Sequence, residues 1–444
     1  MFATFIFLSN EPFISFPLSA NISTRVSLLA LLIILFDNHN LLSSAQFGFR
    51  KRRSTELALL EQKEFILSQF DNKNFVLGLY IDFTKAFDCI HHSILLEKLE
   101  TYGVRGHSQN LIKSYLDHRH QYIQIENCRS DLKQINRGVP QGSILGPFLF
   151  IVYINDLVHI YRDAKYILYA DDASIFFSSP EPSSLQNKAN SALRSLHKRS
   201  AANSLQINTK KTKAVIFRPK SKQINSSLIT LLYENEKIEI DSSVKILGVI
   251  FTQNMLWDAH IESVSGKLSR VVGMTARHRA ILPVNMKLLI YNTLFFSSLY
   301  YCVLVWGTTT RTNLERIHIL QKKIVRALFN VPYHSHTSQL FSKANIIRAF
   351  NLYNYKLSLA FKREVKENLK FFHELSDLDK NTHSYTTRYT EPWKVVTARV
   401  NYSRQKVSYT LPTLLNSFHK SGIDLHTISV RTLRQHFINN PCLQ

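Results

Sequence analysis

The chain has 444 residues, 45% of them hydrophobic, which is enough to bury a sizeable core divided between two or more subdomains. Its 55 lysine and arginine residues against 32 acidic ones give a formal net charge of +23, and its composition excludes collagen, a coiled coil and a disordered chain. So large a positive excess indicates a polyanionic partner, with nucleic acid ahead of an anionic membrane surface. The four cysteines (Cys89, Cys128, Cys302 and Cys442) lack zinc-ligand spacing, which is typical of reduced thiols inside a cell.

The first feature along the chain is the apolar run from Val26 to Phe36. It is much shorter than the ~20 residues that a membrane-spanning helix needs, so we expect no stable membrane insertion. A secretory signal would also carry basic residues ahead of the run, and none precedes Arg25. We therefore predict a buried helix, preferred over a signal peptide, and an intracellular location in the nucleus or cytoplasm.

The following elements are predicted from hydrophobic periodicity. A strand over residues 75–81 runs into Asp82 and is followed by a helical stretch through Leu95 and Leu99. Residues 165–177 resemble two strands that meet at Asp171 and Asp172, a hairpin with carboxylates at its tip. Further helices are predicted over residues 108–116, 144–157 and 184–204, and further strands over 122–126, 132–135, 215–217 and 246–251. Beyond residue 257 the pattern is mostly helical. The order predicts an α+β fold, with a small antiparallel sheet backed by helices and a helical region appended.

Three aspartates lie at predicted strand ends, where a metal site could form. Joining a nucleotide to a strand requires two metal ions ~3.5–4 Å apart, which clamp the attacking and leaving oxygens. Magnesium prefers carboxylate ligands, and Asp82, Asp171 and Asp172 would supply them. Each piece alone has a plainer interpretation, because Asp favours turns and Asp82 could simply cap a helix.

Six strings in a fixed order change that balance. They are residues 45–50 (AQFGFR) with 53–55 (RST), 80–88 (YIDFTKAFD), 138–147 (GVPQGSILGP), 169–172 (YADD), 205–213 (LQINTKKTK) and 245–248 (KILG). Together they resemble the fingers motif and motifs A to E of the reverse transcriptases of non-LTR (LINE-type) retrotransposons. The resemblance runs from about Leu41 to about Leu369.

The resemblance implies a right-hand polymerase fold and RNA-directed DNA polymerase activity. The partners would be an RNA template, a DNA primer and dNTPs, and the cofactors two Mg²⁺ ions, with Mn²⁺ as an alternative; the oligomeric state stays open. The implied layout is an atypical apolar leader over residues 1–40, fingers and palm over 41–255, a helical thumb-like region over 256–370 and a basic C-terminal segment over 371–444.

The resemblance also implies roles for single residues. Asp82, Asp171 and Asp172 would bind the metals, together with the backbone carbonyl of Phe83. Phe87 would lie under the incoming sugar and exclude a 2′-hydroxyl, the group that separates RNA from DNA precursors. The plainer interpretation of Phe87 is a core residue on a helix that follows Asp82.

Four further residues are candidates for nucleotide contacts. Gln141 and Gly142 would line the nucleotide and template side, the glycine allowing close backbone approach, although a simple turn explains them as well. Arg50 is expected to grip the triphosphate, because a guanidinium binds phosphate in a fork. Lys211 is the candidate for protonating the departing pyrophosphate, with Lys210 and Lys213 as neighbours that could replace it.

Other conspicuous residues are predicted to be structural or stay undecided. His91 and His92 are expected to be structural at the end of a helical turn, and Trp306-Gly307 to pack in the core. A thumb helix carrying Lys322, Lys323 and Arg326 could follow the primer–template backbone or present a solvated face.

Two departures leave alternatives open. The family's first fingers motif should precede Leu41, and nothing in this chain resembles the family's upstream endonuclease, so the chain could be a truncated or inactive remnant that only binds nucleic acid. An RNA-directed RNA polymerase would usually carry Asp at position 87 and Gly at 170, where this chain has Phe87 and Ala170.

Overall fold

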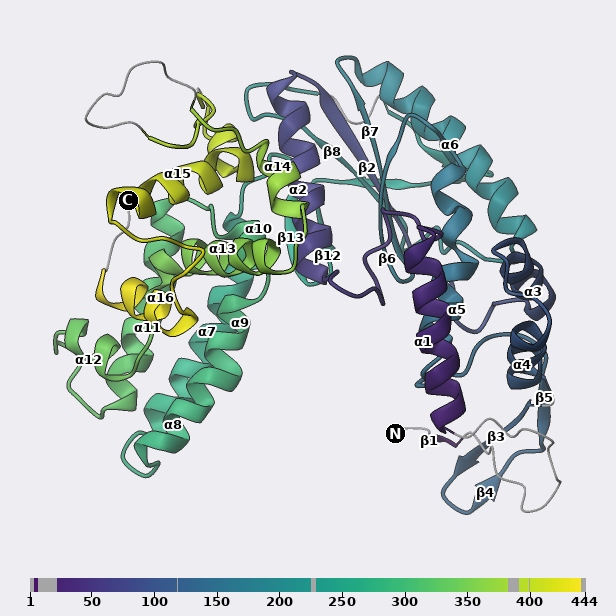
Figure 1. Ribbon diagram of the computed structural model, residues 1–444, viewed down its shortest axis with the longest axis horizontal. Coiled ribbons are helices and arrows are strands. Elements are labelled where there is room, and N and C mark those ends of the chain that lie inside the picture. The colour runs from purple at the N-terminus through teal and green to yellow at the C-terminus, as the bar shows by residue number, and fades with distance from the viewer. Residues whose placement is uncertain are drawn as a thin grey trace. The chain divides into compact units, whose positions relative to one another are not determined.

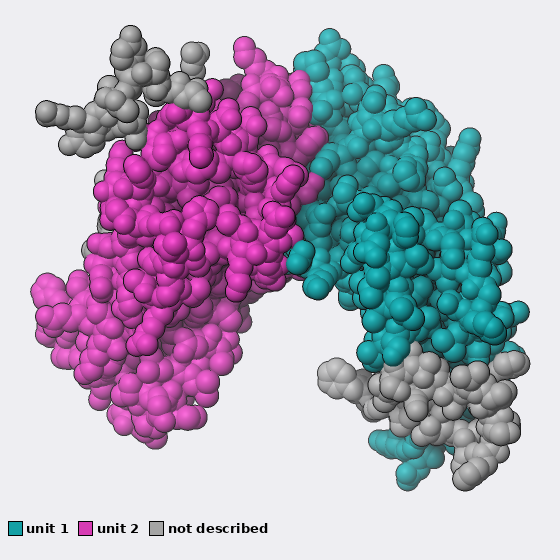
Figure 2. Space-filling model, in the orientation of Figure 1, with its two compact units in different colours: residues 1–54, 77–215, 224–241 teal, residues 55–76, 216–223, 242–444 magenta. Residues whose placement is uncertain are grey.

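The computed structural model describes residues 4–6, 22–117, 119–224, 229–381, 391–398 and 400–440. The chain forms two compact units (Figure 2). Unit 1 comprises residues 1–54, 77–215 and 224–241, and unit 2 comprises residues 55–76, 216–223 and 242–444.

Unit 1 is a mixed α+β unit (Figure 1). Its helices are α1 (Ile22–Asn38), α3 (His92–Thr101), α4 (His107–Leu116), α5 (Gly146–Tyr153) and α6 (Pro182–Ala202), with the 3-10 helix η1 (Asn155–His159). Its strands are β1 (Thr4–Ile6), β3 (Arg119–Ile125), β4 (Cys128–Arg129), β5 (Lys133–Ile135), β6 (Lys165–Tyr169), β7 (Asp172–Ser179), β9 (Leu232–Tyr233), β10 (Glu236–Lys237) and β11 (Glu239–Asp241). It also holds most of β2 (Phe75–Ile81) and β8 (Lys213–Phe217).

The central sheet has five strands in the order β11-β8-β2-β7-β6. Strands β6 and β7 form the predicted antiparallel hairpin, whereas β11 pairs with β8 in parallel. The predicted antiparallel sheet is therefore mixed, because its edge pair is parallel. A parallel pair needs a long connection, and residues 218–238, which include β9 and β10, provide it.

The central position of strand β2 in the sheet explains why its sequence is continuously apolar. All seven of its residues are buried, as expected for a central strand that is covered on both faces. Helix α6 packs on the neighbouring strand β7 (Figure 1), through buried residues such as Leu185, Leu193 and Leu196. The apolar run therefore ends where the strand reaches the surface, at Asp82.

Helix α1 confirms the helix that the first apolar run predicted, although only one side of it is buried. Leu28, Leu32 and Phe36 are buried at intervals of four residues, while Leu31 and Ile34 are exposed. The ring of Phe36 packs against Tyr102 and Phe148, with centroids 5.3 and 5.2 Å away. No helix among the described residues is long and apolar enough to cross a membrane.

Two further elements differ from their predictions because the backbone changes conformation at one or two residues within each. The expected helix over 144–157 divides into α5 and η1 at Ile154. The expected strand over 246–251 is a hairpin of β12 (Ser243–Ile246) and β13 (Val249–Thr252). Its two-residue turn consists of Leu247 and Gly248, which have φ of 44° and 82°, the left-handed values that a tight hairpin turn requires.

Unit 2 is mainly helical beyond that hairpin, as predicted. Its helices are α2 (Thr55–Asp71), α7 (Asp258–Arg277), α8 (Val284–Ile290), the π-helix η3 (Tyr291–Phe296), α9 (Ser297–Tyr300), α10 (Val303–Trp306), α11 (Arg311–Leu328), α12 (Ser338–Lys343), α13 (Ala349–Lys366), α14 (Phe371–Ser376), the 3-10 helix η4 (Ser403–Gln405), α15 (Val407–Lys420) and α16 (Val430–Asn439). Helix α11 packs against α7 and α13, and α13 packs against α10 and α16 (Figure 1).

The core of unit 2 includes a buried ion pair on α2. Lys63 and Glu64 lie 3.4 Å apart, both almost fully buried. Lys63 donates to the carbonyl of Gln405 over 2.8 Å, and Glu64 accepts from the Val407 amide over 3.1 Å. Burial lowers the pKa of Lys63 and raises the pKa of Glu64, and each charge moves the other's pKa back toward its ordinary range. The pair thus attaches the start of α15 to α2.

Candidate active site

Asp82 is the first residue beyond the buried strand β2, and its side chain is half-exposed. Its backbone is fixed by a segment more than 120 residues later. The Asp82 amide donates to Thr212 Oγ1 over 3.2 Å, and the Asp82 carbonyl accepts from the Asn208 amide over 2.8 Å. Phe83 forms an antiparallel bridge with Ile207, and the hydrogen bonds of that bridge use the backbones of Asp82 and Thr84 rather than that of Phe83.

Asp171 and Asp172 lie at the tip of the β6–β7 hairpin. Tyr169 pairs with Asp172, so Ala170 and Asp171 form the turn, with Ala170 at a φ of 56°. Both aspartates are exposed. Since β7 is the sheet neighbour of β2, the start of β7 brings Asp172 toward Asp82.

The carboxylate of Asp172 lies within electrostatic range of the other two carboxylates. Partial desolvation raises the pKa of Asp172, and the negative charges of Asp171 and Asp82 raise it further. Mutual repulsion of this kind favours binding of a cation between the groups. The structure therefore places the three aspartates that the sequence singled out at the ends of neighbouring strands.

The donor set is suited to magnesium. Within the described ranges, no group of three His, Cys, Asp or Glu side chains is arranged to hold a metal ion. Magnesium is usually held by only one or two carboxylates, with substrate phosphates and water completing its shell. Hard carboxylate oxygens on adjacent strands meet that requirement.

The turn that carries the aspartates is held by a segment for which no structural role was predicted. Residues 45–47 run beside β6, where Phe47 donates to the Leu168 carbonyl over 2.7 Å and Leu168 donates to the Ala45 carbonyl over 2.9 Å. The buried Gln46 Oε1 accepts from the amides of Ala170, at 3.2 Å, and Gly48, at 2.7 Å. A Cβ atom on Gly48 would lie 2.3 Å from the Ala170 nitrogen. Gln46 and Gly48 therefore position the turn. The AQFGFR string, which contains both residues, was the feature of the sequence that could have indicated this role.

The loop after Asp82 and the Gly-Pro-Gly loop lie against each other. Val139 donates to the Phe87 carbonyl over 3.0 Å, and Gln141 Nε2 donates to Asp88 Oδ1 over 3.0 Å. Gly138, at a φ of 83°, comes so close that an added Cβ would lie 2.9 Å from the Asp88 Cα. These contacts bring Phe87 and Gln141 together from strings about 50 residues apart.

Gly142 is not in close contact with other protein atoms. Its φ is 77°, and nothing lies within 4 Å of an added Cβ. The left-handed backbone therefore accounts for the glycine, while the open space beside it remains available to a ligand.

Phe87 lies in a turn and not on a helix, because residues 84–88 form turns and α3 begins only at His92. The half-buried Phe87 ring stacks on Phe150 at 4.3 Å and meets the edge of Phe49 at 6.4 Å. The interpretation of Phe87 as a core residue on a helix was wrong about the helix. The stacking contact with Phe150 restricts the movement of the Phe87 ring.

Lys211 and the neighbouring lysines differ in the acidic residues that they contact. Its Nζ lies 4.0 Å from Asp82 Oδ2, and both side chains are well exposed. Lys213 instead pairs with Asp241 on β11. Lys210 is exposed. The structure therefore places Lys211 beside Asp82 and directs Lys213 to the sheet edge.

Arg50 is engaged within unit 1. Its Nη1 donates to the Ser43 carbonyl over 2.8 Å, and its Nη2 lies 3.8 Å from Asp37. Desolvation and the nearby Arg53 lower the pKa of Arg50. A guanidinium has five N–H donors, so these contacts leave donors for a further ligand.

The residues predicted to be structural have structural contacts. His92 Nε2 lies 2.8 Å from the Gly138 carbonyl, and His91 immediately precedes α3, at the start of a helix rather than at the end of one. Trp306 is buried, and a Cβ on Gly307 would lie 2.4 Å from the Val303 carbonyl, which confirms core packing.

Comparison with known proteins identifies the family. The family model for reverse transcriptase (RNA-dependent DNA polymerase) matches residues 21–251, more than half of the chain. The chain therefore belongs to the reverse transcriptase family, and the predicted family is confirmed.

Its relatives are the RNA-directed DNA polymerases of non-LTR retrotransposons. It is 27% identical, over 70% of this chain and 35% of that protein, to the probable RNA-directed DNA polymerase from transposon BS of Drosophila melanogaster. It is 28% identical to the RNA-directed DNA polymerase from mobile element jockey of Drosophila funebris, over 66% of this chain and 33% of that protein. The chain thus spans about a third of the length of these relatives.

Among solved structures, the chain is similar to apo telomerase from Candida tropicalis. The match has a TM-score of 0.43 and 12% identity, over 79% of this chain and 59% of that chain. A likeness at that level does not decide the fold or the function.

Proposed function

We propose that this chain is the core of an RNA-directed DNA polymerase that extends a DNA primer on an RNA template by two-metal nucleotidyl transfer. The observation that supports the proposal most directly is the electrostatic coupling of Asp172 with Asp171 and Asp82 at the ends of neighbouring strands. Membership of the reverse transcriptase family supports it independently.

Asp82, Asp171 and Asp172 would hold two Mg²⁺ ions, or Mn²⁺ in their place, with the backbone carbonyl of Phe83 as a further ligand. Bound there, the ions supply Lewis-acid activation of the primer hydroxyl and charge neutralisation of the triphosphate. Lys211, whose Nζ lies 4.0 Å from Asp82, would donate a proton to the pyrophosphate as it leaves.

The remaining site residues select and orient the nucleotide. Phe87 would exclude a 2′-hydroxyl, because its ring is held against Phe150 and cannot easily withdraw. Gln141, fixed by Asp88, and Gly142, with open space beside it, would line the nucleotide side. Arg50 would contact the triphosphate with donors that Ser43 and Asp37 do not use.

In this proposal the chain has a right-hand polymerase architecture. Residues 41–255 would form the fingers and palm, 256–370 the thumb, and 371–444 a further basic segment. The partners would be the RNA template, the DNA primer and dNTPs, in keeping with the net charge of +23.

The test is incorporation of dTTP on poly(rA)–oligo(dT) with Mg²⁺. We expect incorporation by the purified chain and its loss in Asp171→Asn. The matched control is Asp163→Asn, which removes an exposed carboxylate from the same unit and should leave the rate unchanged. A folded chain that binds the template but incorporates nothing would refute the proposal in favour of a remnant that only binds nucleic acid.

A further inference from the structure

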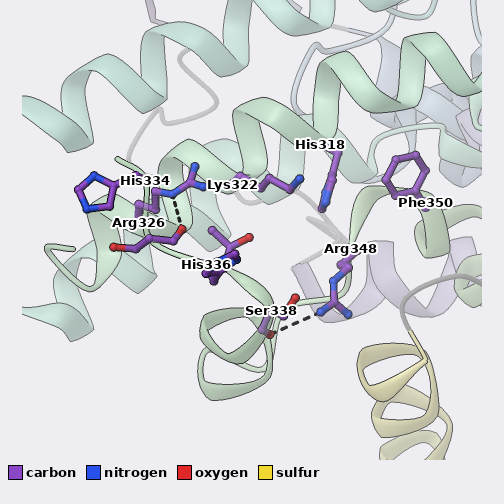
Figure 3. A pocket seen from close by; sticks show the side chains of 10 residues that line it. His318, Lys322, Arg326, His334, His336, Ser338, Arg348 and Phe350 are labelled. Atoms are coloured by element: carbon purple, nitrogen blue, oxygen red, sulfur yellow. Dashed lines mark hydrogen bonds between the residues drawn. The ribbon is translucent and has the colours of Figure 1, made fainter. Parts of the chain in front are cut away.

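A pocket in unit 2 is lined by none of the candidate active-site residues, but it includes Lys322 and Arg326 of the helix whose role the sequence left undecided. Its volume is about 420 Å³, within the ~300–1,000 Å³ range of ligand pockets. Figure 3 shows side chains from α11, from the start of α13 and from the segment before α12 around it. The lining residues are His318, Lys322, Arg326, His334, Ser335, His336, Thr337, Ser338, Arg348 and Phe350.

Basic side chains gather in this pocket, among them Lys322 and Arg326. His318, Lys322 and Arg326 follow one another at intervals of four residues, so they share one face of α11. Arg348 adds a further cation just before α13. Among the described residues, no Asp or Glu lines the pocket, and neither Lys322 nor Arg326 forms an ion pair. Like charges so close together repel one another, and an anion would relieve that repulsion.

The two guanidinium groups are held in position by backbone carbonyls. Arg326 Nε donates to the Ser335 carbonyl over 3.0 Å, and its guanidinium lies 5.4 Å from the centre of the Tyr333 ring. Arg348 donates to the Ile438 carbonyl over 3.0 Å and to the Ser338 carbonyl over 3.5 Å. Groups fixed before a ligand arrives lose little conformational entropy on binding it.

One wall of the pocket is aromatic. The half-buried Phe350 ring lies 4.9 Å from the ring of His318. Burial and the charges of Lys322 and Arg348 lower the pKa of His318 to about 4, so this imidazole is neutral near pH 7. Phe350 is the one apolar side chain among the described lining residues, which argues against a lipid tail as the ligand.

We propose that this pocket binds one nucleotide of a single-stranded nucleic acid, with its phosphate on Lys322 and Arg326 and its base against Phe350. The volume holds roughly a dozen waters at ~30 Å³ each, more than a lone phosphate displaces. Bases splayed out of a single strand stack on aromatic rings, whereas the bases of a duplex are not available to do so. The inference rests on the proposed function only for its choice of nucleic acid as the polyanion.

The test measures binding of a fluorescein-labelled dodecamer of uridylate by anisotropy between 50 and 200 mM salt. Each phosphate of a single strand that the protein neutralises adds ~0.7 to the slope of log K against log[salt]. Lys322→Gln/Arg326→Gln removes both cations from one phosphate, so it should reduce the slope by about 0.7. The matched control is Lys366→Gln/Lys370→Gln. It removes equal charge from exposed sites of the same unit, Lys366 lying about 24 Å along α13 from Phe350, and should reduce the slope less.

Phe350→Leu tests the stacking separately. It should weaken binding of the uridylate oligomer by about tenfold and leave an abasic oligomer of the same length unaffected. Lys322→Gln alone removes no side-chain hydrogen bond between the described residues, so it keeps the slope measurement valid if the double variant misfolds. Because Arg326 still contacts the phosphate, we then expect a slope reduction greater than zero and below ~0.7.

The proposal is overturned if the pocket variants keep the wild-type slope, or if they reduce it no more than the Lys366/Lys370 control does. Two competitors that carry phosphate without a base, inorganic phosphate at the concentration of the oligomer and phosphatidylserine vesicles, test the ligand class. The proposal is also overturned if either competitor displaces the oligomer from the wild-type chain but not from the pocket variants, because the pocket would then bind phosphate or lipid rather than a nucleotide. The readout is binding without catalysis. A chain that incorporates no dTTP would therefore refute the polymerase proposal and leave this one standing.

Discussion

Gly48→Ala is the substitution that most sharply tests how the aspartate turn is held. The new Cβ would lie 2.3 Å from the Ala170 nitrogen and 3.0 Å from the Ala170 Cα, whereas ordinary contacts begin near 3.4 Å. The turn must therefore move by about 1.1 Å, the difference between 3.4 and 2.3 Å. Both atoms belong to the backbone of the residue before Asp171, so the displacement cannot be absorbed by rotating a side chain.

A misplacement of ~1 Å in a catalytic group costs ~100-fold in rate, and overpacking of a filled site costs ~1–3 kcal/mol of stability. We expect kcat/KM for dTTP on poly(rA)–oligo(dT) to fall by that factor, and thermal unfolding to shift downward. The control is Gly266→Ala on α7, where nothing lies within 4 Å of the added Cβ. There, alanine should stabilise the exposed helix by ~1 kcal/mol and leave the rate unchanged. A folded Gly48→Ala chain with activity within threefold of wild type would refute the role assigned to this contact.

Three further outcomes are expected. Phe87→Ala should reduce discrimination against rUTP relative to dTTP by about tenfold or more, because the ring stacked on Phe150 no longer fills the space of the 2′-hydroxyl; unchanged discrimination in single-turnover assays would remove the claim. Lys63→Met should lower the free energy of unfolding by ~3 kcal/mol, since it leaves Glu64 buried without its cation, and Lys63→Met/Glu64→Gln should recover part of that loss in urea titrations. His260 has a pKa lowered from 6.5 to about 4 by burial and nearby lysines, so the unfolded chain binds the proton more readily. The stability that neutral His260 contributes is complete above pH ~6.5 and is lost as the pH falls toward ~4, and the loss reaches ~2 kcal/mol by pH ~5. His260→Gln should therefore reduce the pH dependence of the free energy of unfolding by that amount. A profile identical to that of the wild type would contradict the assignment.

The parts of the site that the sequence predicted are those in which local pattern and chemistry coincide. The apolar run of β2 ends at Asp82, and the apolar strands of the β6–β7 hairpin enclose Asp171 and Asp172, so both strand ends were visible from hydrophobic periodicity. Their pairing as sheet neighbours was not visible, because it depends on strand order rather than on either segment.

The parts that were missed depend on long-range contacts or on single dihedral angles. The hydrogen bond from Ala170 to Gln46 joins residues 124 positions apart, and no local period encodes it. The parallel pairing of β11 with β8 depends on how a long connection returns. The turn at Leu247 required a left-handed residue where the sequence offered only one glycine, Gly248, as a signal. The pocket on α11 follows from helix packing, which brings residues 334–338 and Arg348 to the same face of that helix.

The contact between residues 45–48 and the β6–β7 turn also has a consequence for biosynthesis. During translation the AQFG segment emerges about 120 residues before its partner Leu168, and at ~5–20 residues per second that interval lasts roughly 6 to 25 s. Throughout it, Gln46 and Phe47, both buried in the folded chain, have no strand to pair with. The aspartate turn is thus completed only after Leu168 has emerged, and a ribosome that stalls within this interval leaves the backbone of residues 45–47 unpaired and exposed to association with other chains.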